Sequence, residues 1–185
     1  KELDWAEGYH AEFVSPPVVS SLLLSDGQSV SQHQALDGTI AGIERFSQRD
    51  AAAWRATHSR FHPIIRDVLL PFYHTLPRHT ATALSKVGAE PDGREFLRLW
   101  QLTPRQLVDE IFECAAVKTL LLSQMAIPRG VALDYAGGGI EALKLIAGDE
   151  KPELARGGSH SIAQVLQRAY VHSGGQIRAV HHVDK

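Results

Sequence analysis

RGGSHSIAQVLQRAYVHSGGQIRAVHHV, residues 156–183, is the stretch that decides the fold class. It opens on the glycine pair Gly157-Gly158, and a second pair follows at Gly174-Gly175. The apolar residues between the two pairs recur with helical spacing, which predicts a helix from about Ile162 to His172. The β-prone residues that follow predict a strand over 176–183. A glycine turn, a helix, a glycine exit and a strand together make half of a βαβ unit.

The first glycine pair has two physical interpretations. Glycines before a helix allow the backbone to approach a neighbouring element closely, which would serve tight strand-to-helix packing. The N-terminus of the helix also offers free N–H groups and a partial positive charge, and the strand beside it can present backbone groups to an adenine edge. For the glycines themselves, packing is the preferred interpretation from the residues alone.

The first third of the chain predicts short strands. Residues 9–14 and 18–24 are β-prone runs, and Asp26-Gly27 is a strong signal for a hairpin turn. Residues 28–33 alternate as the return strand of that hairpin. Because an isolated hairpin is only marginally stable in water, we expect it to belong to a larger assembly.

The middle of the chain predicts helices. Ser47 can cap a helix, with Asp50 in place of the usual glutamate three residues on, and Thr103-Pro104 is a second helix start. Pro63 predicts a kink or a break. The spacing of apolar residues predicts helices over 37–47, 47–70, 81–87, 96–102, 103–113, 116–125 and 140–146.

Composition restricts the function classes. The 19 basic and 21 acidic residues give a net charge of −2, so there is no electrostatic case for nucleic acid. The longest apolar stretch, residues 115–127, is too short to span a bilayer. The lone cysteine, Cys114, is predicted to be a buried small hydrophobe. We expect a cytoplasmic protein, and leave a peripheral contact with a membrane open.

The segment from Arg156 is similar to the second nucleotide-domain motif of phytoene desaturase-like and amine-oxidase-like flavoproteins. In that motif a basic residue and a glycine pair precede a helix, and the next strand ends in a valine whose backbone faces the FAD adenine. The resemblance implies that Arg156, Gly157, Gly158 and Val183 bind FAD. It also implies an FAD-dependent oxidoreductase that desaturates, saturates or isomerises an apolar, unsaturated substrate by hydride transfer.

The rest of the chain resembles this family more loosely. Residues 25–30 resemble its substrate-domain hairpin, residues 47–54 the helix start that follows, and Gly137-Gly138-Gly139 a glycine loop. The Gly-x-Gly-x-x-Gly turn of the family is missing. We therefore expect an internal fragment with an α+β fold. Residues 1–150 would be a helical cap with a small antiparallel sheet, and residues 151–185 a partial FAD-binding βαβ element.

Such a fragment should need the remainder of the flavin domain to bind FAD, and should be inactive alone. No catalytic residue is predicted, because the flavin carries the hydride in this chemistry. The alternative is a non-catalytic helical interaction module, in which residues 37–125 present a groove to a partner. The order of glycine pair, helix, glycine pair and strand separates the two, since only a flavin domain needs it.

Two further patterns are assigned to structure rather than chemistry. His58 and His62 lie one helical turn apart, but a zinc site needs a third ligand, so no metal site is predicted and the pair is expected on a solvated face. Aromatic residues at helical spacing could line a channel for a lipophilic substrate, yet core packing is the preferred interpretation. These are Trp54, Phe61, Phe72, Tyr73, Phe96 and Trp100.

Overall fold

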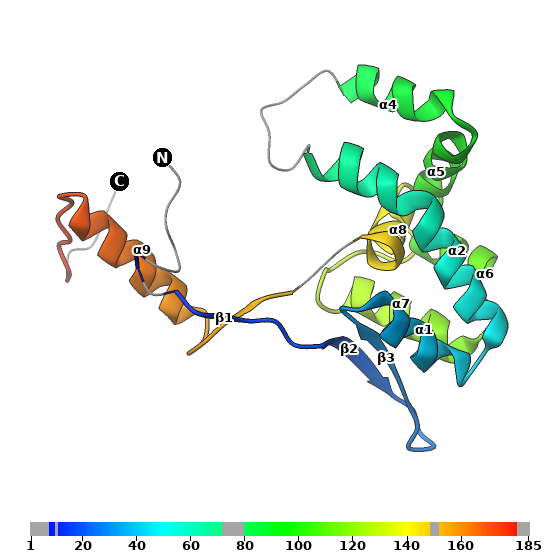
Figure 1. The fold of residues 1–185 in the computed structure, drawn as a ribbon, viewed down its shortest axis with the longest axis horizontal. Coiled ribbons are helices and arrows are strands. Elements are labelled where there is room, and N and C mark those ends of the chain that lie inside the picture. The colour runs from blue at the N-terminus through cyan, green and yellow to red at the C-terminus, as the bar shows by residue number, and fades with distance from the viewer. Residues whose placement is uncertain (1–7, 10, 72–79, 149–151, 181–185) are drawn as a thin grey trace. The chain divides into compact units, whose positions relative to one another are not determined.

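The structure is a computed structural model, and it describes residues 8–9, 11–71, 80–148 and 152–180. It has the predicted α+β fold, in which helices predominate and the described strands pair into two short antiparallel ribbons (Figure 1). The chain divides into two compact units. The larger unit is Pro17–Lys151, and the smaller unit combines Lys1–Pro16 with Pro152–Lys185.

The larger unit begins with the predicted hairpin. Strand β2 (Val18–Leu23) pairs antiparallel with β3 (Ser29–His33). Gly27 takes a φ of 82° at the turn, a conformation that favours glycine, and the Asp26 carboxylate accepts a hydrogen bond from the Gln28 N–H at 2.9 Å. Val30 on β3 is fully buried, so one face of the ribbon contributes to the core.

Helices make up the rest of this unit, and the two predicted caps are confirmed. The Ser47 hydroxyl accepts from the Asp50 N–H at 3.1 Å, and Thr103 forms a complete capping box with Gln106. The helical segments are α1 (Leu36–Glu44), α2 (Gln48–Ile64), η1 (Ile65–Leu69), α4 (Thr80–Ala89), α5 (Pro91–Gln101), α6 (Pro104–Ile111), α7 (Ala115–Ala126) and α8 (Gly139–Ala147).

Pro63 changes the hydrogen-bond pattern of its helix without ending it. The segment remains helical through Pro63, and π-helix η1 follows directly after α2. Proline has no N–H and its ring crowds the preceding turn, so an ordinary α-helical ladder cannot continue unchanged at this point. The predicted disturbance therefore takes the form of a wider helical turn, which is a common way for a helix to absorb an irregularity.

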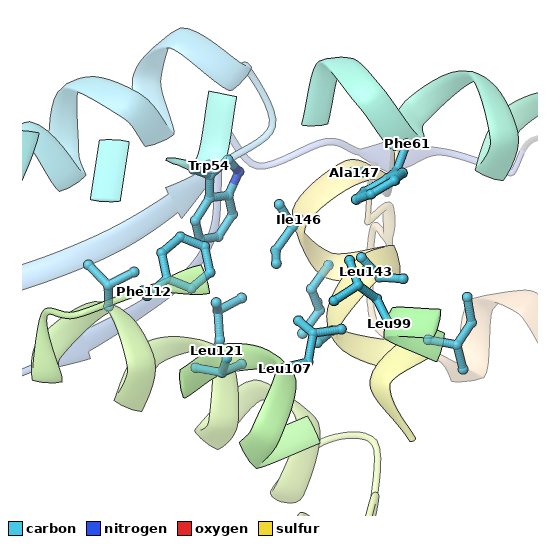
Figure 2. Packing of buried hydrophobic residues seen from close by; sticks show 14 of the residues in the cluster. Trp54, Phe61, Leu99, Leu107, Phe112, Leu121, Leu143, Ile146 and Ala147 are labelled. Carbon is cyan, nitrogen blue, oxygen red and sulfur yellow. The ribbon is translucent and has the colours of Figure 1, made fainter. Parts of the chain in front are cut away.

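The core is centred on α8, which packs against α2, α5, α6 and α7 (Figure 2). Leu143 and Ile146 of this helix are among the largest fully buried side chains. The helix can start deep in the unit because residue 139 is a glycine, and a Cβ there would lie only 2.3 Å from the Leu99 carbonyl oxygen. The Gly139 N–H donates to the Leu102 carbonyl at 2.8 Å, which fixes α8 against the end of α5.

A buried carboxylate joins two distant parts of the larger unit. Asp50 is 0% exposed and accepts hydrogen bonds from the N–H groups of Glu113, at 3.0 Å, and Cys114, at 2.8 Å. These N–H groups precede the first residue of α7, so the Asp50 side chain caps that helix from across the fold. The sequence predicts that Asp50 takes the place of the glutamate in a capping box with Ser47. The backbone N–H of Asp50 does donate to the Ser47 hydroxyl, but the Asp50 carboxylate binds the N–H groups of Glu113 and Cys114 instead of turning back to Ser47.

The smaller unit pairs β1 (Phe13–Val14) antiparallel with β4 (Leu154–Ala155), and α9 (His160–His172) follows. Val165 and Ala169 are the buried side chains of α9. The Arg168 guanidinium donates to the Tyr9 carbonyl at 2.9 Å, and the Tyr9 ring meets the His172 ring edge-on at 6.0 Å. The residues before Pro17 therefore complete a structure formed mainly by the C-terminal segment.

The predicted strand over 176–183 is wrong for the residues that can be judged. Residues 176–180 form no strand within the described part of the chain, and residues 181–183 lie outside it. Val180 has a φ of 57°, which is incompatible with extended backbone. Among the described residues of the run 9–14, a strand forms at Phe13–Val14, where the backbone pairs with β4, and Tyr9, Ala11 and Glu12 form none.

The close start of α8 gives a stability prediction. Gly139→Ala should lower the free energy of unfolding by about 2 kcal/mol, because the new methyl group meets backbone that cannot move aside. Gly42→Ala in α1 is the matched control, since its Cβ would lie 3.5 Å from the nearest atom. That change should raise the free energy by up to about 1 kcal/mol through helix propensity. Urea unfolding of both variants measures the difference, and equal effects would contradict the packing argument.

The cap that Asp50 forms on α7 gives a second stability prediction. Asp50→Ala should cost about 3 kcal/mol of unfolding free energy, because it leaves the N–H groups of Glu113 and Cys114 without their acceptor. The control is Asp26→Ala, which removes a carboxylate that also accepts a backbone N–H but in an exposed turn. There we expect a loss of about 0.5 kcal/mol. Thermal denaturation separates the outcomes, and a small loss for Asp50→Ala would show that water replaces the carboxylate.

Candidate functional site

The turn that carries the predicted cofactor residues joins β4 to α9 in the smaller unit. Gly157 and Gly158 have φ values of 85° and 88°, the left-handed region in which other residues are strained. A Cβ added to either glycine would have no described atom within 4 Å. Close packing therefore does not account for the pair, contrary to the preferred interpretation of the sequence. The backbone conformation accounts for it, and leaves open space beside the turn.

Local hydrogen bonds hold this turn in place. The Gly158 N–H donates to the Ala155 carbonyl at 3.0 Å, and the Ser161 hydroxyl donates to the Gly158 carbonyl at 2.7 Å. Helix α9 begins at His160, and the N–H groups of Ser161 and Ile162 in its first turn donate to the Gly158 and Ser159 carbonyls, both at 3.1 Å. The turn thus combines a fixed shape, room for a neighbour and the positive end of a helix dipole, which together suit a phosphate group.

Arg156 stands at the same turn and is paired. Its Nε lies 2.8 Å from Glu12 Oε2, and its backbone N–H donates to the Glu12 carbonyl at 2.9 Å. The side chains of Arg156 and Glu12 are 68% and 70% exposed, respectively. An ion pair in water is worth about 0–1 kcal/mol, so the guanidinium is available to a more strongly charged anion.

The structure therefore brings together three of the four predicted cofactor residues. Arg156, Gly157 and Gly158 form one exposed turn. Val183 lies outside the described residues, so its backbone contact with an adenine stays a prediction.

The glycine run at residues 137–139, which resembles a glycine loop of the family, lies against the end of α5 and the start of α6. The N–H groups of Gly137 and Gly139 donate to the carbonyls of Gln101 and Leu102, at 3.0 Å and 2.8 Å. A Cβ at Gly138 would lie 2.8 Å from the ring of Pro104. These backbone groups are used inside the fold, so this glycine run serves helix packing rather than ligand binding.

The histidine pair is not the solvated pair that the sequence predicts. The His58 and His62 rings stack 4.9 Å apart and nearly parallel, and both side chains are half-buried. His62 Nδ1 lies 2.9 Å from the Ala147 carbonyl oxygen, where it ties α2 to the end of α8. No group of three or more metal-binding side chains occurs within the described residues. His62 therefore has a packing role.

The aromatic side chains belong to the core, as predicted, wherever they can be judged. Trp54 and Phe61 are almost fully buried (Figure 2). Phe96 is also almost fully buried, and the Trp100 ring packs edge-on against it at 6.1 Å. Phe72 and Tyr73 lie outside the described residues. Cys114 is half-buried and precedes α7, so it is less enclosed than predicted.

An exposed apolar stripe on α9 was not predicted from the sequence. Ile162, Leu166 and Tyr170 lie four residues apart on this helix and are all exposed. The spacing i, i+4, i+8 of these apolar residues is the sequence signal that indicates the stripe. Val165 and Ala169 lie beside it on the buried face of α9. A hollow of about 600 Å³ also runs along α9, lined by Gln164, Gln167, Arg168, Val171 and His172. It does not include the Arg156–Gly158 turn.

Comparison with known proteins gives one relationship. No family model matches the chain, and no solved structure matches it. Over 174 residues, or 94% of its length, the chain is 25% identical to a limonene dehydrogenase subunit of Castellaniella defragrans. It spans 32% of the length of that relative, about a third.

That similarity supports a relationship to an oxidoreductase at this coarse level. It does not single out the phytoene desaturase-like flavoproteins within that class. Among the described residues, no helix is both long and apolar enough to cross a membrane.

Proposed function

We propose that the chain is part of an FAD-dependent oxidoreductase that acts on an apolar, unsaturated, terpene-like substrate. The observation that carries this proposal is the similarity to the limonene dehydrogenase subunit, which extends over 94% of the chain. Limonene is a hydrocarbon with carbon–carbon double bonds and no ionisable group. Its dehydrogenation removes a hydride and a proton: the hydride, with its electron pair, goes to a bound redox cofactor, and the proton goes to a base or to water.

The Arg156–Gly158 turn is where the chain would hold FAD. Gly157 and Gly158 leave open space beside a helix N-terminus, and the Arg156 guanidinium is held there only by an exposed ion pair. These features fit a pyrophosphate. A bound flavin supplies the hydride acceptor, and residues of this chain contribute binding and positioning. Val183 is proposed to add a backbone contact to the adenine.

In this proposal the two units have different roles, one in binding substrate and the other in binding the flavin. The larger unit, Pro17–Lys151, provides the substrate side, and the smaller unit provides part of the flavin side. The remainder of the flavin domain would come from sequence that this chain does not contain, since the chain spans 32% of its relative. The relative is one subunit of its enzyme, so we also propose that a second polypeptide takes part in the reaction.

A flavin spectrum tests the proposal. The purified 185-residue chain should show no stoichiometric flavin absorbance near 450 nm, about the usual flavin maximum, whereas the gene product purified from its native host should be yellow. A gene product without flavin, even after reconstitution with FAD, would contradict the oxidoreductase proposal and favour the helical interaction module. Stoichiometric flavin in the 185-residue chain would contradict the divided site.

A matched pair of variants tests the turn itself. Gly158→Val in the gene product should weaken FAD binding at least about tenfold, because a branched side chain fills the open space beside the turn. Gly130→Val is the control, since Gly130 also has a positive φ and no described atom within 4 Å of an added Cβ. Both variants carry similar backbone strain. Equal loss of flavin in the two, measured by absorbance after dialysis, would remove the turn from the FAD site.

A further inference from the structure

A groove in the larger unit is separate from the Arg156–Gly158 turn. It lies between α2 and η1 on one side and α4 and α5 on the other, and has a volume of about 620 Å³. Its apolar wall is formed by Pro63, Ile64, Val68 and Val87. Small-molecule sites typically have about 300–1,000 Å³ and mostly apolar walls, so the groove has the size and lining of a ligand site.

Two irregularities of the chain shape this groove. Pro63 and the π-helical turn of η1 widen the helix on one wall. Helices with a π-helical turn often have a functional site at that turn. On the other wall, a Cβ at Gly93 would lie 1.7 Å from the Val87 carbonyl oxygen, so α4 and α5 meet through their backbones. The Val87 side chain lies at this close contact. It is buried and forms part of the lining of the groove.

The charges at the rim are balanced. Arg60 donates two hydrogen bonds to the Asp92 carboxylate, at 3.0 Å and 2.8 Å. Arg66 donates two to Asp67, at 2.7 Å and 2.8 Å, and this hydrogen bonding holds the pKa of the Asp67 carboxyl below its ordinary value. Each of these two carboxylates thus has a guanidinium partner. Lys86 and Glu90 also line the groove and add one charge of each sign. The groove therefore offers apolar contact without an excess of one charge, which favours an uncharged ligand.

We propose that this groove binds an uncharged, apolar small molecule of the terpene hydrocarbon class. The class of ligand rests on the proposed function, whereas the location rests on the groove alone. Burial of an apolar ligand against Ile64, Val68 and Val87 provides the binding energy through the hydrophobic effect. The groove would hold substrate or product of the reaction.

The test is a titration of the ¹⁵N-labelled 185-residue chain with limonene, followed by NMR. We expect saturable shifts in the amide signals of residues 64–69 and 84–93, which form the two walls. Val68→Trp places a large ring in the groove and should weaken binding at least about tenfold. Ile127→Trp is the matched control, because Ile127 is 81% exposed and is not part of the groove lining; its affinity should be unchanged.

Other outcomes overturn the proposal. Saturable shifts confined to α9, or equal affinity in Val68→Trp and the parent chain, would place the ligand elsewhere. Absence of shifts at the solubility limit of limonene would exclude this ligand class from the groove. If Val68→Trp loses its folded spectrum, Ile64→Asn provides a second variant that makes the wall polar and should also weaken binding.

These results are independent of the flavin spectrum. If the gene product is yellow but limonene does not bind in the groove, the oxidoreductase proposal stands and the groove proposal is wrong. If the gene product is colourless but limonene binds in the groove, the groove proposal stands and the oxidoreductase proposal is wrong. The protein would then bind terpenes without flavin chemistry.

Discussion

The larger unit depends on the burial of one short helix. Most residues of α8 are buried, and helices α2, α5, α6 and α7 pack around it. A helix of nine residues is marginal in water, so α8 is stabilised by these contacts rather than by its own hydrogen bonds. Its ends are fixed as well, by the Gly139 N–H on the Leu102 carbonyl and by His62 on the Ala147 carbonyl. The β2–β3 hairpin is bonded to α8 through Gln32, whose side-chain amide donates to the Leu145 carbonyl at 2.8 Å.

The smaller unit, in contrast, leaves several large apolar side chains exposed. Val165 and Ala169 are buried on α9, whereas Phe13, Leu154 and Tyr170 are exposed. The two-stranded ribbon and one helix of the described residues bury little apolar surface. In the proposed division of the flavin site, the rest of the flavin domain would cover these side chains. The same sheet and helix that expose apolar side chains also shape the Arg156–Gly158 turn.

Local signals predicted local structure well, and long-range contacts were not accessible from the sequence. Asp26-Gly27 predicted the hairpin and Thr103-Pro104 predicted a helix start, because both act within a few residues. The side chain of Asp50 instead caps a helix that begins 65 residues further along the chain, at Ala115. The predicted strand over 176–183 is absent at residues 176–180, the part of it that the structure describes, for a related reason. β propensity takes effect where a partner strand pairs with the segment, and the sequence pattern does not show whether one does.

The glycines show why a motif alone does not identify a nucleotide site. Gly27 makes a hairpin turn, and Gly139 permits helices to approach until a Cβ would meet a carbonyl at 2.3 Å. Gly157 and Gly158 share the positive φ and the open surroundings of Gly27, but they differ from both other glycines in preceding the N-terminus of a helix. Of these three kinds of glycine, only the last combines room for a ligand with the positive end of a helix dipole. The geometry therefore distinguishes the exposed Gly157-Gly158 turn, in the segment that resembles a flavoprotein motif, from the packed glycine run at residues 137–139.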